Sequence, residues 1–201
     1  MSMDDEFELP LFPLSTVLFP DGVLPLQIFE PRYLDMVGDC LRNQTGFGVC
    51  VIAEGKEAGG TARVQPVGTL GQIVDFDQRD NGLLGITVSG IQRFRVLRTW
   101  VREDRLLMGW VRPLPDPEPL ILPPTHGALT EFLRAILNRA GDPWKSLPER
   151  FDDVHWVTGR LMELLPLPLE QRYEALENDS AQDRLELLID VLGSWPEALQ
   201  R

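Results

Sequence analysis

The segment LPLFPLSTVLFPDGVLPLQIFEPRY, residues 9–33, is the most unusual part of this 201-residue chain, with five prolines and a single glycine. Proline fixes φ and lacks an N–H donor, so each proline restricts the backbone around it. Pro10 and Pro13 therefore predict a short strand at the edge of a sheet. The PDG sequence at residues 20–22 predicts a tight turn, and Pro31 predicts the first turn of a helix.

Residues 45–111 show the pattern of antiparallel β-strands. The Asn81-Gly82 pair stands between two apolar runs and predicts a hairpin, because both residues tolerate positive φ. At residues 93–96 arginines alternate with apolar side chains, which predicts a half-buried strand. A helix is expected near residues 31–42, before these strands. Together the patterns predict a small, curled, antiparallel β-barrel.

The segment RPLPDPEPLILPPT, residues 112–125, contains six prolines and predicts a stiff connector. After it, apolar residues recur at helical spacing in four segments. The first predicted helix stops at Gly141, and the last has Asp179 as its N-cap. We therefore expect an α+β fold, with a β-rich domain at residues 1–122 and a four-helix bundle at residues 123–201.

Composition limits the classes of function. The formal net charge is −12, and the parts before and after Leu122 are both acidic, which argues against nucleic acid and anionic membranes as partners. The N-terminus lacks the apolar core of a signal peptide, and we expect a cytoplasmic protein. Cys40 and Cys50 form no metal-binding motif and are expected to be buried, reduced thiols.

Motifs for catalysis or cofactor binding are missing from the sequence. It contains no P-loop, no dinucleotide fingerprint and no GxSxG, so we expect no cofactor, no metal and no catalytic residue. An unrecognised enzyme would have to use the carboxylates Asp75 and Asp77, or Cys50 with His126 or His155 if the fold brings them together. Asp75 and Asp77 are more simply explained as residues on a solvent-exposed strand face, and Cys50 as an inert thiol within an apolar strand.

The proline-rich segment at residues 9–33 resembles the start of the Lon N-terminal domain family, in particular its stand-alone members. The strings FGV at residues 47–49, VGT at 67–69 and VSGIQRFRV at 88–96 resemble the family in the expected order, as do the closing helices. The string FPDG at residues 19–22 departs from the family's FPGG.

The resemblance implies a PUA-like β-domain followed by helices. In Lon proteases this region helps to select protein substrates, and this chain contains neither the ATPase nor the Ser-Lys peptidase sequence. The resemblance therefore implies a non-catalytic module that binds unfolded or extended polypeptide segments or a protein partner. RNA binding, suggested only by the PUA-like architecture, and an unrecognised enzyme are the alternatives.

The predicted binding site is an exposed apolar groove beside the sheet. We expect its lining to comprise Phe12, Phe19, Phe29, Tyr33 and Trp110, with Arg32, Arg93 and Arg95 as polar anchors. The sequence has one local basic feature, an arginine run made of Arg93, Arg95, Arg98, Arg102 and Arg105. Its alternation suits a solvent-facing strand edge that is protected from pairing with another chain. The run could also hold carboxylate groups of a partner, because arginine guanidinium groups match carboxylates. Glu30 and Arg32 are also expected to pair with sheet residues and hold the first helix in place.

Overall fold

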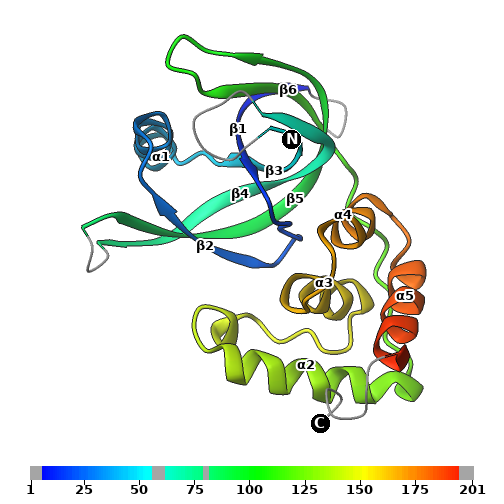
Figure 1. The fold of residues 1–201 in the computed structure, drawn as a ribbon. Coiled ribbons are helices and arrows are strands. Elements are labelled where there is room, and N and C mark those ends of the chain that lie inside the picture. Colours follow the sequence, from blue (N-terminus) through cyan, green and yellow to red (C-terminus); the bar gives the residue numbers. More distant parts are fainter. Residues whose placement is uncertain (1–5, 56–61, 79–81, 195–201) are drawn as a thin grey trace. The chain divides into compact units, whose positions relative to one another are not determined.

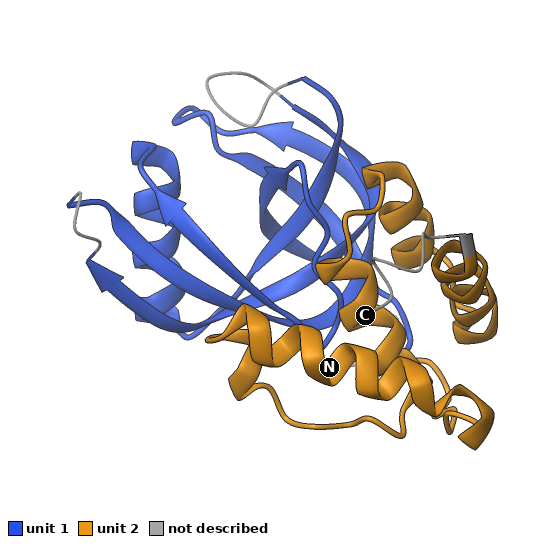
Figure 2. Ribbon diagram, turned by 60° about the horizontal axis from the view of Figure 1, so that its bottom comes forward, with its two compact units in different colours: residues 1–116 blue, residues 117–201 orange. Residues whose placement is uncertain are grey.

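The computed structural model describes residues 6–55, 62–78 and 82–194. The chain divides into two compact units, residues 1–116 and residues 117–201 (Figure 2). The division between Asp116 and Pro117 falls inside the proline-rich connector, a few residues before the boundary predicted from the sequence.

The first unit contains a mixed sheet of six strands (Figure 1). The strands are β1 (Phe7–Leu14), β2 (Val23–Ile28), β3 (Phe47–Glu54), β4 (Arg63–Gln78), β5 (Leu84–Val101) and β6 (Leu107–Pro113). Their order is β2-β5-β4-β3-β1-β6, and β6 also pairs with β5, so five strands form a closed circuit of pairings. The predicted antiparallel order holds from β3 to β6. It is wrong for β1, which pairs with β3 in parallel because β2 and a helix intervene between them.

β1 lies between two other strands, so the predicted edge position of Pro10 and Pro13 is wrong. The first half of β1 pairs with β6, and its second half pairs with β3. Pro10 has its partner on β6 and Pro13 has its partner on β3. Each proline therefore has one side of its backbone outside the ladder, which accommodates a residue without an N–H donor.

The turn predicted at residues 20–22 positions the start of β2. The Gly22 N–H donates to the Phe19 carbonyl oxygen over 3.1 Å, and Asp21 has a φ of 60°. Gly90 of β5 holds this turn in place through two backbone hydrogen bonds. Its N–H donates to the Gly22 carbonyl oxygen, and its carbonyl oxygen accepts the Asp21 N–H, both over 2.9 Å. A Cβ atom at position 90 would lie 2.2 Å from the Phe19 carbonyl oxygen, so the close approach requires glycine.

The hairpin predicted at Asn81-Gly82 joins β4 to β5. Gln78 pairs with Leu84 across it, and Gly82 has a φ of 80°. Asn81 itself lies outside the described residues.

Helix α1 (Pro31–Asn43) packs an apolar face onto the sheet. Pro31 begins the helix, as predicted. The buried face of α1 comprises Tyr33, Met36, Val37 and Cys40, which join a core cluster with Phe12, Phe47, Ile86 and Val88. Each large apolar side chain buried in this way stabilises the unit by about 1.5–3 kcal/mol. Cys50 lies in a second core cluster, and both cysteines are buried thiols, as predicted.

The described part of the second unit contains four α-helices and two short 3-10 helices. They are α2 (Gly127–Ala140), α3 (Val154–Leu164), α4 (Leu169–Glu177) and α5 (Ala181–Ser194), with η1 (Pro124–His126) and η2 (Trp144–Ser146). α3 packs against the other three α-helices. In Figure 1, the axis of α2 lies in the plane of the page, whereas α3 is viewed nearly down its axis, so these two helices cross at a steep angle. The predicted four-helix bundle is therefore not confirmed. Ser180 caps α5 by accepting the Asp183 N–H over 3.1 Å, in place of the predicted Asp179.

Candidate binding pocket

A pocket of about 270 Å³ opens between β1, β2 and the start of α1. Its lining comprises Phe12, Leu14, Pro25, Leu26, Gln27, Ile28, Phe29, Glu30 and Tyr33. All of these residues belong to the proline-rich segment at residues 9–33. Ligand pockets are usually about 300–1,000 Å³, so this one suits a single side chain better than a cofactor.

Two stacked aromatic rings form the floor of the pocket. The ring centroids of Phe12 and Tyr33 are 4.0 Å apart, with an angle of 26° between the ring planes. Phe12 comes from the half of β1 that pairs with β3, and Tyr33 from the buried face of α1. Both side chains are buried, and aromatic contacts of this kind contribute about 0.5–1.5 kcal/mol beyond their buried area. The floor is therefore part of the core.

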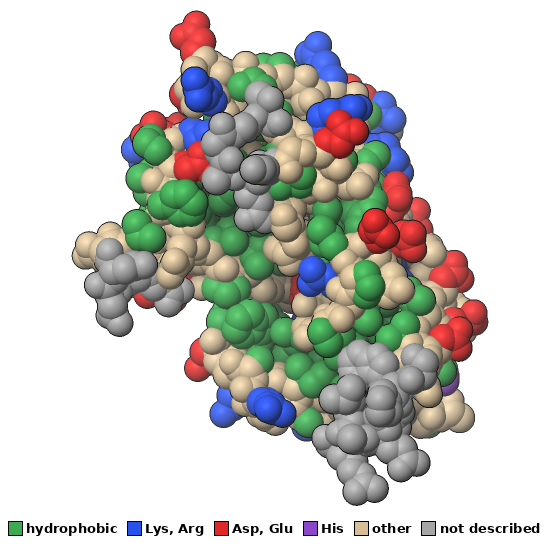
Figure 3. All heavy atoms as spheres, in the orientation of Figure 1, with side chains coloured by type: hydrophobic (Ala, Val, Ile, Leu, Met, Phe, Trp, Pro, Cys, Tyr) green, Lys and Arg blue, Asp and Glu red, His purple; other side chains and the backbone are tan. Residues whose placement is uncertain are grey.

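Phe29 forms the rim of the pocket. It follows β2 directly, and 59% of its surface is exposed. Figure 3 shows hydrophobic side chains gathered on this side of the first unit, where β2 and α1 lie in Figure 1. An exposed aromatic ring beside an apolar pocket can cover a ligand side chain without any change in the core.

An ion pair closes one side of the pocket. Arg32 Nη2 lies 2.9 Å from Glu30 Oε2, and the guanidinium lies 4.7 Å from the centre of the Tyr33 ring. Arg32 Nη1 also donates to the carbonyl oxygen of Arg105, in the turn between β5 and β6, over 2.9 Å. The expected link between α1 and the sheet is therefore made by Arg32, whereas Glu30 pairs with Arg32 itself.

The structure gathers part of the predicted site. Phe12, Phe29 and Tyr33 line the pocket, and Arg32 lies beside it. The remaining four predicted residues do not line it: Phe19 and Arg93 are buried, Arg95 is exposed, and Trp110 is half-buried on β6. The prediction missed Leu14, Pro25, Leu26, Gln27, Ile28 and Glu30, although their position in the same short segment was a usable signal.

The residues considered for catalysis line none of three pockets among the described residues. Burial raises the pKa of the Cys50 thiol, whereas Asp75 and Asp77 are exposed on β4. Two other pockets lie beside Leu41 and Gln72 in the first unit and beside Phe132 in the second. Neither these nor the β1–β2–α1 pocket is lined by Cys50, Asp75, Asp77 or His126.

Among residues 6–55, 62–78 and 82–194, no group of three or more His, Cys, Asp or Glu side chains could hold a metal ion. No helix in these ranges has the length and apolar character needed to cross a membrane.

Comparison with known proteins identifies the family. Residues 8–194 match the model of the ATP-dependent protease La (LON) substrate-binding domain. The chain belongs to this family. The resemblance noted from the proline-rich segment is thereby confirmed, and it extends across both units.

Two solved structures of Lon N-terminal domains are similar to this chain. The Lon N-terminal domain protein from Xanthomonas campestris is 38% identical with a TM-score of 0.73, over 94% of this chain and 99% of that one. The N-terminal domain of Mycobacterium avium complex Lon protease is 18% identical with a TM-score of 0.63, over 92% of this chain and 97% of that one, a likeness of fold alone.

The curated relatives are longer proteins. The Lon protease of Anaeromyxobacter dehalogenans (strain 2CP-C) is 26% identical over 201 residues, which cover 96% of this chain and 24% of that protein. Protein cereblon of Danio rerio is 28% identical over 124 residues, or 58% of this chain and 28% of that protein. This Lon family chain thus spans about a quarter of the length of the Lon protease it matches.

Proposed function

We propose that this chain is a non-catalytic polypeptide-binding module. In this proposal the β1–β2–α1 pocket takes an apolar side chain from an unfolded or extended segment. The observation that carries it is Phe29, a large aromatic residue that is 59% exposed at the rim of a pocket with an aromatic floor. Membership of the Lon substrate-binding domain family supports polypeptide as the class of ligand.

The lining of the pocket supports a role in binding rather than catalysis. Nucleophilic or acid–base catalysis needs a nucleophile and a base, or two titratable groups, that converge on a substrate. Glu30 is the carboxylate of the pocket, and it is already paired with Arg32. The remaining lining is predominantly apolar, which suits the burial of a hydrophobic side chain.

Finer predictions from the sequence are part of this proposal. They are a PUA-like barrel within residues 1–122, a helical domain at residues 123–201, and a cytoplasmic location. Phe19, Arg93, Arg95 and Trp110 also remain proposed contacts for polypeptide, and all four lie in the first unit.

Replacing Phe29 with serine tests the proposal. The ligands are a permanently unfolded, carboxymethylated protein and a short Gly/Ser peptide with one central phenylalanine, each labelled for fluorescence anisotropy. Loss of one central apolar contact should weaken binding about tenfold or more. The matched control is Leu34→Ser, because Leu34 is also an exposed apolar residue, 40% exposed on α1, but does not line the pocket.

Two results would overturn the proposal. Equal weakening by Phe29→Ser and Leu34→Ser would mean that the pocket is not the binding site. Absence of binding between the unmodified chain and either ligand would remove polypeptide recognition as the function.

A further inference from the structure

Two arginines face each other on the outer side of β5 and β6. Arg95 pairs with Arg112 in the register of these strands, and both residues are exposed. Like charges directly opposite each other on a sheet destabilise it. An ion pair with Glu6 already offsets the charge of Arg112, and a bound anion would offset that of Arg95.

A third arginine is held by two tryptophans beside this pair. The Arg98 guanidinium lies 5.6 Å from the centre of the Trp100 ring and 5.4 Å from that of the Trp110 ring. Cation–π contacts of this kind restrict the guanidinium, so less side-chain freedom is lost when it binds a carboxylate. In the described part of the chain, neither Arg95 nor Arg98 has a carboxylate within ion-pair distance.

The chain itself places one carboxylate on this surface. Glu6, immediately before β1, forms an ion pair with Arg112, and its second oxygen accepts the Trp110 indole N–H over 2.8 Å. The contact shows the chemistry that the surface recognises, since one carboxylate uses an arginine and an indole donor together. Figure 3 shows Lys and Arg side chains gathered on the upper right of the first unit, where β6 runs in Figure 1.

We propose that the β5–β6 arginine surface, defined as Arg95, Arg98, Trp110 and Arg112, binds an acidic segment of a partner polypeptide. The partner's carboxylates would pair with Arg95 and Arg98, and one of them would displace Glu6 at Arg112. This proposal extends the function to a second class of segment and does not depend on the β1–β2–α1 pocket.

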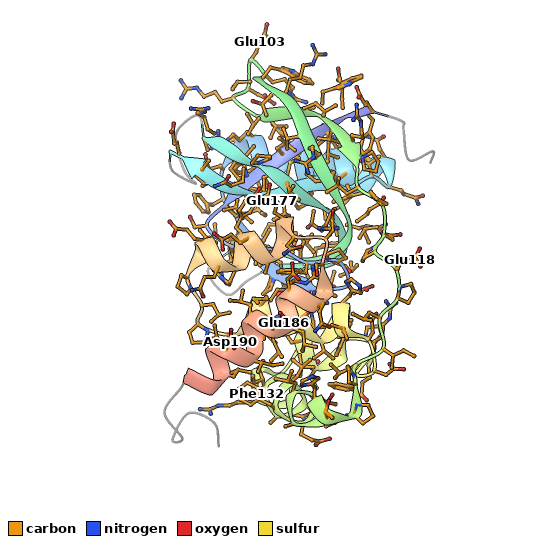
Figure 4. All side chains as sticks on the ribbon, turned by 90° about the vertical axis from the view of Figure 1, so that its right-hand side faces the viewer. Glu103, Glu118, Phe132, Glu177, Glu186 and Asp190 are labelled. Carbon is orange, nitrogen blue, oxygen red and sulfur yellow. The ribbon has the colours of Figure 1, made fainter. Side chains whose placement is uncertain are left out.

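An acidic polypeptide fits this surface better than a nucleic acid does. Planar guanidinium groups match carboxylates through paired hydrogen bonds, and Glu6 already shows such a partner in place. The chain has a net charge of −12, with exposed acidic side chains such as Glu186 and Asp190 on α5 (Figure 4). A long phosphate backbone would be repelled beyond this small surface, whereas a short acidic segment need not extend past it.

The test uses a labelled peptide rich in Glu and Asp, a matched peptide with Gln and Asn in their place, and fluorescence anisotropy. Of the two peptides, we expect only the acidic one to bind. Raising the salt concentration from about 0.05 M to about 0.5 M should weaken its binding several-fold. Arg95→Glu/Arg98→Glu should weaken it about tenfold or more. The control Arg42→Glu/Arg63→Glu makes the same change in net charge at two other exposed arginines and should have little effect.

Folding and the role of Glu6 are tested in parallel. Thermal unfolding checks that each variant is folded, and Arg95→Gln/Arg98→Gln replaces the glutamate variant if that one is not. Glu6→Gln removes the resident carboxylate and should raise the affinity for the acidic peptide a few-fold, whereas weaker binding would contradict the displacement step. Phe29→Ser should leave this binding unchanged, so failure of the pocket and failure of this surface are distinguishable.

Three results would overturn the proposal. One is equal weakening by the Arg95/Arg98 variant and its charge-matched control. The second is tighter binding of a single-stranded RNA of equal charge, which would make nucleic acid the ligand. The third is a dimer that dissociates in the Arg95/Arg98 variant, which would make the occupant a second copy of the chain.

Discussion

The first unit carries two surfaces of opposite character, the β1–β2–α1 pocket and the β5–β6 arginine surface. The pocket is made by one continuous segment, residues 9–33, and its one ion pair is internal. The arginine surface combines two strands with Glu6, which lies more than a hundred positions from Arg112 in the sequence. A short motif can thus encode an apolar pocket, whereas the arrangement of charges depends on the register of distant strands.

The two surfaces should also respond differently to solution conditions. Binding in the pocket relies on apolar burial, which moderate salt hardly weakens. Binding to exposed arginines relies on charge, and the Debye length falls to about 10 Å at 0.1 M salt and about 3 Å at 1 M. The salt dependence of each ligand therefore reports which surface it uses.

The largest effect is expected at the floor of the pocket. Tyr33 is 4% exposed and stacks on Phe12, so Tyr33→Ala should lower the free energy of unfolding by about 3–5 kcal/mol. Chemical denaturation measures the loss. Binding to the arginine surface should fall only in proportion to the fraction unfolded, whereas binding to the pocket should fall further because Tyr33 is part of its lining.

Phe29→Ala is the matched control for this prediction. Its ring is 59% exposed, so the stability should change by no more than about 0.5 kcal/mol while binding to the pocket is lost. If Tyr33→Ala proved as harmless as Phe29→Ala, the distinction between a structural floor and a functional rim would fail.

Local backbone features of the fold could be predicted from the sequence. The helix start at Pro31, the turn at residues 20–22 and the hairpin at residues 81–82 each depend on residues close together in the chain. The position of β1 could not be predicted, because its parallel pairing with β3 depends on a crossover through β2 and α1. Two prolines suggested an edge, and the structure instead gives each of them a half-paired stretch of strand.

The sequence indicated which aromatic residues could line the site, but not which of their side chains are buried and which are exposed. Phe19 and Phe29 both end apolar runs within the same segment, yet Phe19 is 4% exposed and Phe29 is 59% exposed. The difference arises from distant contacts, among them the close approach of Gly90 to the Phe19 backbone. Such contacts cannot be inferred from spacing along one strand.

The arrangement of the arginine surface depends on an irregularity in the sheet, which the sequence pattern did not predict. Alternation placed Arg93 and Arg95 on one face, but the register shifts between Val96 and Arg98 and sets Arg98 opposite Trp110. A β-bulge changes which side chains share a face. This segment contains no glycine or proline that would indicate such a bulge. The sequence therefore indicates Arg98 as part of a basic run, but not its contacts with Trp100 and Trp110.

An intermediate effect is expected at Arg32, which connects the pocket to the turn between β5 and β6. Arg32→Gln should lower the free energy of unfolding by about 1.5–3 kcal/mol, because it removes the hydrogen bond from the guanidinium to the Arg105 carbonyl oxygen and leaves Glu30 without this partner. Chemical denaturation measures this loss. Arg42→Gln is the control, since its pair with Asp39 is exposed and should contribute at most about 0.5 kcal/mol. Equal effects of the two variants would show that Arg32 stabilises the unit no more than an exposed ion pair does.

The smallest effect is expected from the ionisation of Glu6, and it concerns the arginine surface alone. Hydrogen bonds from Arg112 and Trp110 hold the pKa of Glu6 below its usual value. A lowered pKa in the folded state means that the stabilisation is present above the unfolded pKa, about 4.3, and is lost as the pH falls through the folded value. The melting temperature of the unmodified chain should therefore exceed that of Glu6→Gln at neutral pH, and the difference should vanish in acid.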